Sequence, residues 1–230
     1  MRRLVIISCL ICAFVIGVTA QDEYKKWEFY GGYSALANDN IKNETGLTEL
    51  DTVLEGRETM RGFNLALTRN VHRYVGVKFD YSLHLREDEF TRPLGSGTID
   101  STFQNFLGGI QIKDNGEDAP RFKPFAHALA GVSFQKVDID SPNMSTIFGI
   151  DDFHTNETSF AMAFGGGLDI KLNHKIDVRV IQLDWNIIRH GDQQAGTFTR
   201  INPLGAVGQP LIVPGYTGHN FRIGAGIVIH

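Results

Sequence analysis

The chain of 230 residues has a formal net charge of −4 at pH 7, and 42% of its residues are hydrophobic. So small a charge excludes the broad basic surface used by nucleic-acid-binding proteins, and we expect no nucleic-acid partner. Both cysteines, Cys9 and Cys12, lie in the N-terminal leader described next. The rest of the chain therefore cannot form the disulfide framework common in small secreted domains.

The N-terminal segment predicts a cleaved signal peptide. Arg2 and Arg3 form a short basic start, and residues 4–18 are apolar. Small residues over 18–20 give the pattern that a signal peptidase reads, so we expect cleavage before Gln21. The apolar stretch is shorter than the roughly 20 residues a spanning helix needs, which argues against an uncleaved anchor. We therefore divide the chain into a signal peptide (1–20) and one domain (21–230).

Beyond the leader, apolar and polar side chains alternate with a period of two, which predicts β-strands. Eight such segments follow in chain order, at about 26–35, 59–68, 75–85, 101–113, 124–136, 158–172, 175–189 and 219–230. The third is the clearest. Its two faces consist of Val75, Val77, Phe79, Tyr81, Leu83 and Leu85 against Gly76, Lys78, Asp80, Ser82 and His84.

The seventh segment breaks the alternation once. Val178 and Val180 share one phase, whereas Ile181 and Leu183 share the other. A one-residue β-bulge near Val180 and Ile181 would restore a continuous apolar face. The bulge would also bring the polar residues of this strand together on the opposite face, namely Asp177, Arg179, Gln182, Asp184 and Asn186.

The polar faces predict which side of the sheet points outward. They combine charges with glycine, alanine and serine, and the charged residues are Lys78, Asp80, Asp169, Lys171, Asp177, Arg179, Asp184 and Arg222. Glycine and alanine disfavour strands, but the narrow interior of an eight-stranded barrel needs small residues. Charges inside such a barrel would have to pair with one another. This pattern favours an apolar face in contact with lipid.

The connections between strands favour the same arrangement. Those at about 36–58, 86–100, 137–157 and 190–218 are long, and those at about 69–72, 114–121 and 173–174 are short. Strict alternation of long and short connections is typical of an outer-membrane barrel, with short periplasmic turns and long extracellular loops. A soluble sandwich or lipocalin-like barrel would bury the apolar face and has no reason to place its long loops at one end.

Five segments resemble a known family in their order and spacing. They are residues 28–34 (EFYGGYS), 124–132 (PFAHALAGV), 164–170 (FGGGLDI), 180–185 (VIQLDW) and the final strand, 221–229. Together they resemble the outer-membrane β-barrel domain family that includes the OmpA membrane domain and OmpX. The resemblance implies an eight-stranded antiparallel up-and-down transmembrane barrel in the bacterial outer membrane, with a last strand read by the barrel-assembly machinery. We expect no downstream peptidoglycan-binding domain.

The sequence contains no nucleophile elbow of the form G-x-S-x-G and no H-E-x-x-H zinc motif. We therefore assign no catalytic, cofactor-binding or metal-binding residue, and we expect neither enzymatic activity nor a cofactor. The best enzymatic candidate, the run Asp151, Asp152, Phe153 and His154, contains a histidine that a carboxylate could orient as a base, but it lacks a nucleophile. The other weak candidates are a calcium set at Asp138, Asp140, Asp151 and Asp152 and the run His190, Gly191 and Asp192.

We therefore expect a structural, adhesion-type or interaction protein that acts through long extracellular loops. The alternative is a small porin-like channel with a narrow charged lumen, although side chains fill the lumen of most eight-stranded barrels. The expected partners are outer-membrane lipid and lipopolysaccharide, the barrel-assembly machinery during insertion, and an unknown extracellular partner. We expect a monomer.

Overall fold

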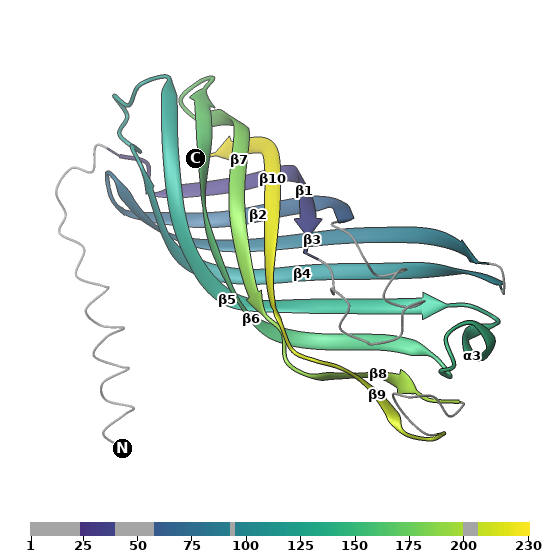
Figure 1. Ribbon diagram of the computed structural model, residues 1–230. Coiled ribbons are helices and arrows are strands. Elements are labelled where there is room, and N and C mark those ends of the chain that lie inside the picture. Colours follow the sequence, from purple (N-terminus) through teal and green to yellow (C-terminus); the bar gives the residue numbers. More distant parts are fainter. Residues whose placement is uncertain (1–23, 40–57, 93–94, 200–206) are drawn as a thin grey trace, which may run out of the picture.

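The computed structural model describes residues 24–39, 58–92, 95–199 and 207–230, and the predicted signal peptide lies outside these ranges. The described residues form ten β-strands and one short helix (Figure 1). The elements are β1 (Trp27–Asn38), β2 (Glu58–His72), β3 (Val75–Arg92), β4 (Gly95–Lys113), β5 (Phe122–Asp140), α3 (Met144–Ile147), β6 (Phe153–Lys171), β7 (Ile176–Arg189), β8 (Gln193–Thr197), β9 (Pro210–Val213) and β10 (Thr217–Ile229).

Eight of the strands close into one antiparallel barrel, in the order β1-β10-β7-β6-β5-β4-β3-β2. The first and last strands seal it, with pairs that run from Phe29↔Ile229 to Ala37↔Phe221. Closure matters because a backbone group without a partner cannot bond to water inside a bilayer. The predicted all-β, eight-stranded up-and-down barrel is confirmed. In the described part of the chain, we find no helix with the length and apolar character needed to span a bilayer.

The barrel is inverted relative to a soluble protein. Large apolar side chains lie on its outer face, where Phe79 is 63% exposed and Ile112 is 57% exposed. Charged side chains on the same strands point into the lumen, where Lys78 and Arg179 are fully buried. The prediction that the apolar face points outward is confirmed. The lipocalin-like alternative, which would bury that face, is wrong.

Strand β7 contains the predicted bulge. Leu168 of β6 pairs with Ile181 and Asp169 pairs with Arg179, so Val180 has no partner on β6. The pairing with β10 shifts register at the same place. Val180 and Ile181 consequently both lie on the outer face, 43% and 38% exposed. The extra residue keeps the apolar side of β7 toward lipid along its whole length.

The second long loop predicted from the sequence, 86–100, is instead mostly strand. β3 continues to Arg92 and β4 begins at Gly95, with Glu87 paired to Asp100 between them. The prediction was wrong because the apolar alternation ends where the strands leave the lipid, and the outer face becomes acidic there. The backbone pairing continues past that point.

The third predicted loop, 137–157, is shorter for the same reason. β5 runs to Asp140 and β6 begins at Phe153, leaving 141–152 as the connection that contains α3. The fourth loop carries the hairpin β8-β9. Figure 1 shows the ends of β3 to β6 extending beyond the barrel, with α3 and the hairpin beside their tips. We call the described residues of 86–101, 137–159 and 190–216 the cap. The short turns, the start of β1 and the end of β10 all lie at the opposite end of the barrel from the cap. In outer-membrane barrels that end faces the periplasm, so the cap faces outside the cell.

Candidate functional site

The first feature of the lumen is a network of four charged side chains in its periplasmic half. Arg179 donates from Nε to Asp169 Oδ1 at 2.8 Å and from Nη2 to Glu28 Oε1 at 3.2 Å. Lys113 Nζ lies 3.0 Å from Asp169 Oδ2 and also bonds to Glu28. Two cations therefore face two anions, and all four side chains are buried. Buried charges persist only when they are paired in this way.

A second network lies farther along the barrel axis and is centred on Arg222. Its guanidinium donates from Nε to Asp184 Oδ2 at 2.8 Å and from Nη1 to Asp80 Oδ1 at 2.9 Å. Asp80 also accepts from Asn64 Nδ2 at 2.9 Å, and Asp184 Oδ1 lies 2.9 Å from His127 Nε2. This single cation thus joins β3, β7 and β10 across the lumen.

Two aromatic rings stack on one charge of these networks, and a glycine leaves space for another. The Arg179 guanidinium carbon lies 4.4 Å from the ring centre of Tyr30 and 3.9 Å from that of Phe125. At Gly165, an added Cβ would lie 2.0 Å from Asp184 Oδ1. The lumen therefore needs small residues beside its charges, as the sequence predicted.

The third network closes the periplasmic mouth. Asp177 Oδ2 accepts from Lys123 Nζ at 2.7 Å and lies 2.9 Å from His230 Nε2. Seven of the eight charges predicted to lie inside the barrel are buried there. Lys171 is the exception and corrects that prediction. It lies at the rim, where its Nζ donates to the backbone oxygen of Glu117 at 2.9 Å.

An apolar layer lies in the extracellular half of the lumen, beside buried polar side chains such as Asn105 and Asn186. Its position follows from chain order: Leu36 lies toward the cap from Glu28 on β1, as does Phe103 from Lys113 on β4. Its members are all buried, and they are Leu36, Met60, Phe103, Leu107, Leu129, Ala161, Ala163 and Ile188. Side chains therefore fill this cross-section of the barrel without hydrated charges.

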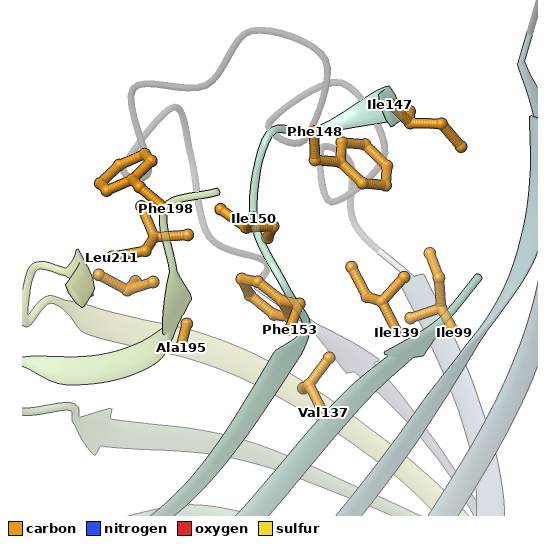
Figure 2. Packing of buried hydrophobic residues seen from close by; sticks show 11 residues of the cluster. Ile99, Val137, Ile139, Ile147, Phe148, Ile150, Phe153, Ala195, Phe198 and Leu211 are labelled. Atoms are coloured by element: carbon orange, nitrogen blue, oxygen red, sulfur yellow. The ribbon is translucent and has the colours of Figure 1, made fainter. Parts of the chain in front are cut away.

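The cap has a hydrophobic core of its own outside the membrane. Figure 2 shows Ile99, Val137 and Ile139 on the wall of strands, facing Phe148 and Phe153. The hairpin side contributes Ala195, Phe198, Leu211 and Val213, and α3 and the segment after it contribute Ile147 and Ile150. These eleven side chains are all buried. The connections above the barrel thus pack into one body with a defined surface.

A carboxylate at Glu157 ties the last loop to β6. It accepts from His190 Nδ1 at 2.6 Å, from Gly191 N at 2.7 Å and from Gln193 Nε2 at 2.6 Å. The His190 ring stacks on Tyr216 with centroids 4.4 Å apart. Burial by itself would raise the pKa of Glu157, but these donors outweigh it and hold the pKa below its ordinary value.

The structure separates the residues of the enzymatic candidate. Phe153 lies in the cap core, whereas His154 lies on the outer face and bonds to Asp138. Asp151 accepts backbone bonds from Asp152 at 2.9 Å and from Thr197 at 2.7 Å. Hydrogen bonding of this kind lowers the pKa of Asp151 despite the opposing effect of burial. These groups act as loop supports and do not converge on one point.

The calcium set is not assembled either. Asp138 forms ion pairs with Lys136 Nζ, at 2.6 Å, and with His154. Asp140 lies two residues farther along β5, opposite Thr98 of β4. Across the described ranges, no group of three or more His, Cys, Asp or Glu side chains is arranged to hold a metal ion. In the remaining run, Asp192 Oδ1 accepts from Gly215 N at 2.7 Å, which closes a loop.

Several charged residues of the lumen and cap were not identified from the sequence. Lys113 and Lys123 lie at strand ends, where the alternation has too few neighbours to stand out. Glu28 has the polar phase of the first predicted strand but was not counted among the interior charges. His127 has the polar phase of β5, and that signal was available. Glu157 lay in a segment read as loop, so its phase on β6 was not considered.

A closed barrel with an apolar outer face and a charged, filled interior defines the class of outer-membrane β-barrel proteins. Residues 8–227 match the outer membrane protein beta-barrel domain family. The chain belongs to that family, and its place is the bacterial outer membrane. No curated protein matches the chain.

Solved structures share the fold at low sequence identity. The outer membrane protein OprG from Pseudomonas aeruginosa is 12% identical with a TM-score of 0.54, and the match covers 90% of this chain and 96% of that one. The outer membrane protease OmpT from Escherichia coli is 9% identical with a TM-score of 0.50, covering 92% and 98%. Ail, the attachment invasion locus protein of Yersinia pestis, is 12% identical with a TM-score of 0.45, covering 89% and 99%. These likenesses concern the fold alone.

Proposed function

We propose that this chain is a non-conducting outer-membrane protein whose cap contacts a partner outside the cell, in a structural or adhesion-type role. The observation that carries the proposal is the buried core of the cap, which is built on strands that continue past the lipid. Flexible loops need no such core. A packed core gives the outer surface a fixed shape, and binding residues are commonly presented by loops on a rigid scaffold.

The alternative function is a small channel. Buried polar atoms without a partner favour it, among them the side-chain groups of Asn186, Ser133 and Asn105, because water would have to hydrate them. The apolar layer opposes it. An ion would have to pass Leu36, Phe103 and the rest of that layer after crossing the paired charges, and it would lose its hydration there. We therefore favour the closed barrel.

We propose that the protein has no enzymatic activity. The two carboxylate–histidine pairs of the cap serve its structure: Glu157 holds His190 beside Tyr216, and Asp138 holds His154 on the outer face. We further propose that the exposed apolar band contacts lipid and lipopolysaccharide directly, and that the closed barrel is a monomer.

Two measurements test the proposed function. The first measures the ion conductance of the purified barrel in planar bilayers. We expect no stable conductance steps, and regular steps would favour the channel instead. The second compares cells that display the wild type with cells whose segments 141–152 and 193–213 are replaced by short glycine-serine turns. We expect the replacement to abolish adhesion to cultured cells, to abiotic surfaces or between bacteria. Equal adhesion by all measures would contradict a role for the cap. Heat-modifiable mobility on gels verifies that the replaced barrel still folds.

A further inference from the structure

The periplasmic mouth contains a basic pocket beside the third lumen network. The segment before β1 crosses this mouth, at the end where Figure 1 marks the C-terminus. Lys25 N donates to Asn115 O at 3.1 Å, and Tyr24 forms a β-bridge with Gly116. Asn70 of β2 donates from Nδ2 to Lys25 O at 2.7 Å. These bonds hold Lys25 in place between the end of β2 and the β4–β5 turn.

Two cavities that share His174 open at this mouth, with volumes of about 520 and 550 Å³. The basic and imidazole side chains that line them are Lys25, Lys26, Arg121, Lys171, His174 and His230. Among the described lining residues, Glu117 is the single carboxylate. A concave surface with this excess of positive charge attracts anions.

Two nitrogens at this mouth lack a hydrogen-bond partner. Lys25 Nζ is shielded from solvent and has no hydrogen-bond partner, and the same holds for Nδ1 of His230. The other ring nitrogen of His230 is engaged by Asp177, whose charge Lys123 also compensates at 2.7 Å. Burying an ammonium group is costly unless a bound group supplies the missing acceptor.

We propose that the cavity lined by Lys25 binds a phosphate group, with Lys25 Nζ as its main donor. The other cationic side chains at this mouth add a field that suits an oxyanion with more than one charge. The pocket lies at headgroup level: Trp27 lines its rim half exposed, with the Arg69 guanidinium 5.4 Å from its ring centre. Tryptophan in that setting marks the membrane interface. The phosphate is carried either by a phospholipid of the periplasmic leaflet or by a soluble compound.

The electrostatics of the mouth agree with this assignment. Burial, followed by the repulsion of Lys123, lowers the pKa of Lys25 to about 8. Lys171 and Lys113 act in the same direction, whereas Asp177 acts against them. The lysines therefore repel one another at this mouth. A bound phosphate would supply the compensating charge and raise the pKa of Lys25 again.

The test uses the purified full-length barrel and does not depend on the role of the cap. In dodecyl maltoside, which carries no phosphate, inorganic phosphate is titrated in a calorimeter at constant ionic strength. We expect saturable binding that Lys25→Gln weakens by about tenfold or more. Lys175→Gln is the matched control, because it removes the same charge from the same end of the barrel without lining either cavity. We expect it to change the affinity by less than about twofold.

A second arm distinguishes the two sources of phosphate. The barrel is released from phosphatidylglycerol nanodiscs, and retained lipid is counted by native mass spectrometry. Loss of one retained lipid in Lys25→Gln, but not in Lys175→Gln, would identify a lipid headgroup. Phosphate binding without lipid retention would identify a soluble compound. The proposal is overturned if neither probe binds the wild type, or if both variants behave alike. Unchanged heat-modifiable mobility verifies that each variant folds.

Discussion

The Arg222 network allows the sharpest test of how the barrel holds charge. Arg222 is buried on β10 and makes three close contacts with two carboxylates, at 2.8 Å and 2.6 Å to Asp184 and at 2.9 Å to Asp80. In Arg222→Met, a shorter unbranched side chain occupies the space of the aliphatic stem and carries no charge. Asp80 would then keep Asn64 at 2.9 Å and the Lys78 ammonium at 3.6 Å as its remaining partners.

We expect Arg222→Met to lower the free energy of unfolding by about 3–5 kcal/mol, the usual cost of removing one partner from a buried ion pair. The loss should come from the stranded anions and not from the missing guanidinium. The quadruple variant Lys78→Met, Asp80→Asn, Arg222→Met, Asp184→Asn removes both cations and both carboxylates and keeps acceptors for the amides nearby. We expect it to recover most of the loss, because replacing a whole buried ion network with neutral groups is often close to neutral.

The assay is urea unfolding in thin phosphatidylcholine vesicles, followed by the fluorescence of the chain's two tryptophans. The three proteins should share one unfolding slope, so that the midpoints report stability. The reasoning is refuted if Arg222→Met loses less than about 1 kcal/mol, the value of an ordinary hydrogen bond. It is also refuted if the quadruple variant is no more stable than the single one.

Three further predictions concern the cap and the lipid face. Because folding lowers the pKa of Glu157, its contribution to stability is complete above its ordinary pKa and is lost as the pH falls through the folded value. The protection factor of the Gly191 amide, which is its exchange rate relative to the intrinsic rate at the same pH, should therefore fall on acidification in the wild type but not in Glu157→Gln; equal pH profiles would contradict this. Phe153→Ala should destabilise the cap core by about 3–5 kcal/mol and expose it to protease while the barrel stays heat-modifiable, whereas an intact cap would argue against the core. Leu183→Arg, near the middle of β7 and exposed to lipid, should cost about 2–4 kcal/mol in vesicle unfolding; a neutral effect would place Leu183 away from the bilayer centre.

The barrel could be predicted because membrane burial and strand geometry act on every residue locally. Along β3, each side chain from Val75 to Leu85 alternates between lipid and lumen, so the pattern can be read without knowing any partner. The bulge at Val180 was predictable for the same reason. A single extra residue inverts the phase, and the membrane requires that the phase be restored.

The pairing of the lumen charges could not be predicted. Glu28 and Arg179 meet across the barrel although 151 residues separate them in the chain. Alternation places both side chains inside, but their height depends on the tilt and stagger of strands around the whole barrel. Which cation meets which anion is therefore a property of the closed sheet.

The sequence by itself determined the inverted barrel, its eight strands and the bulge in the seventh, since period-two alternation is local and the bilayer imposes it on each strand separately. Tertiary structure alone decided that the strands continue beyond the lipid and carry a cap. Outside the membrane the outer faces of β3 to β6 are solvated, so the apolar side reverses to the inner face, as at Ile99 and Ile139. That reversal ends the alternation expected of a lipid-facing strand, so the sequence of these strand ends predicted loops. The core that fills the reversed side comes from connections far away in the chain, which meet only once the barrel has closed.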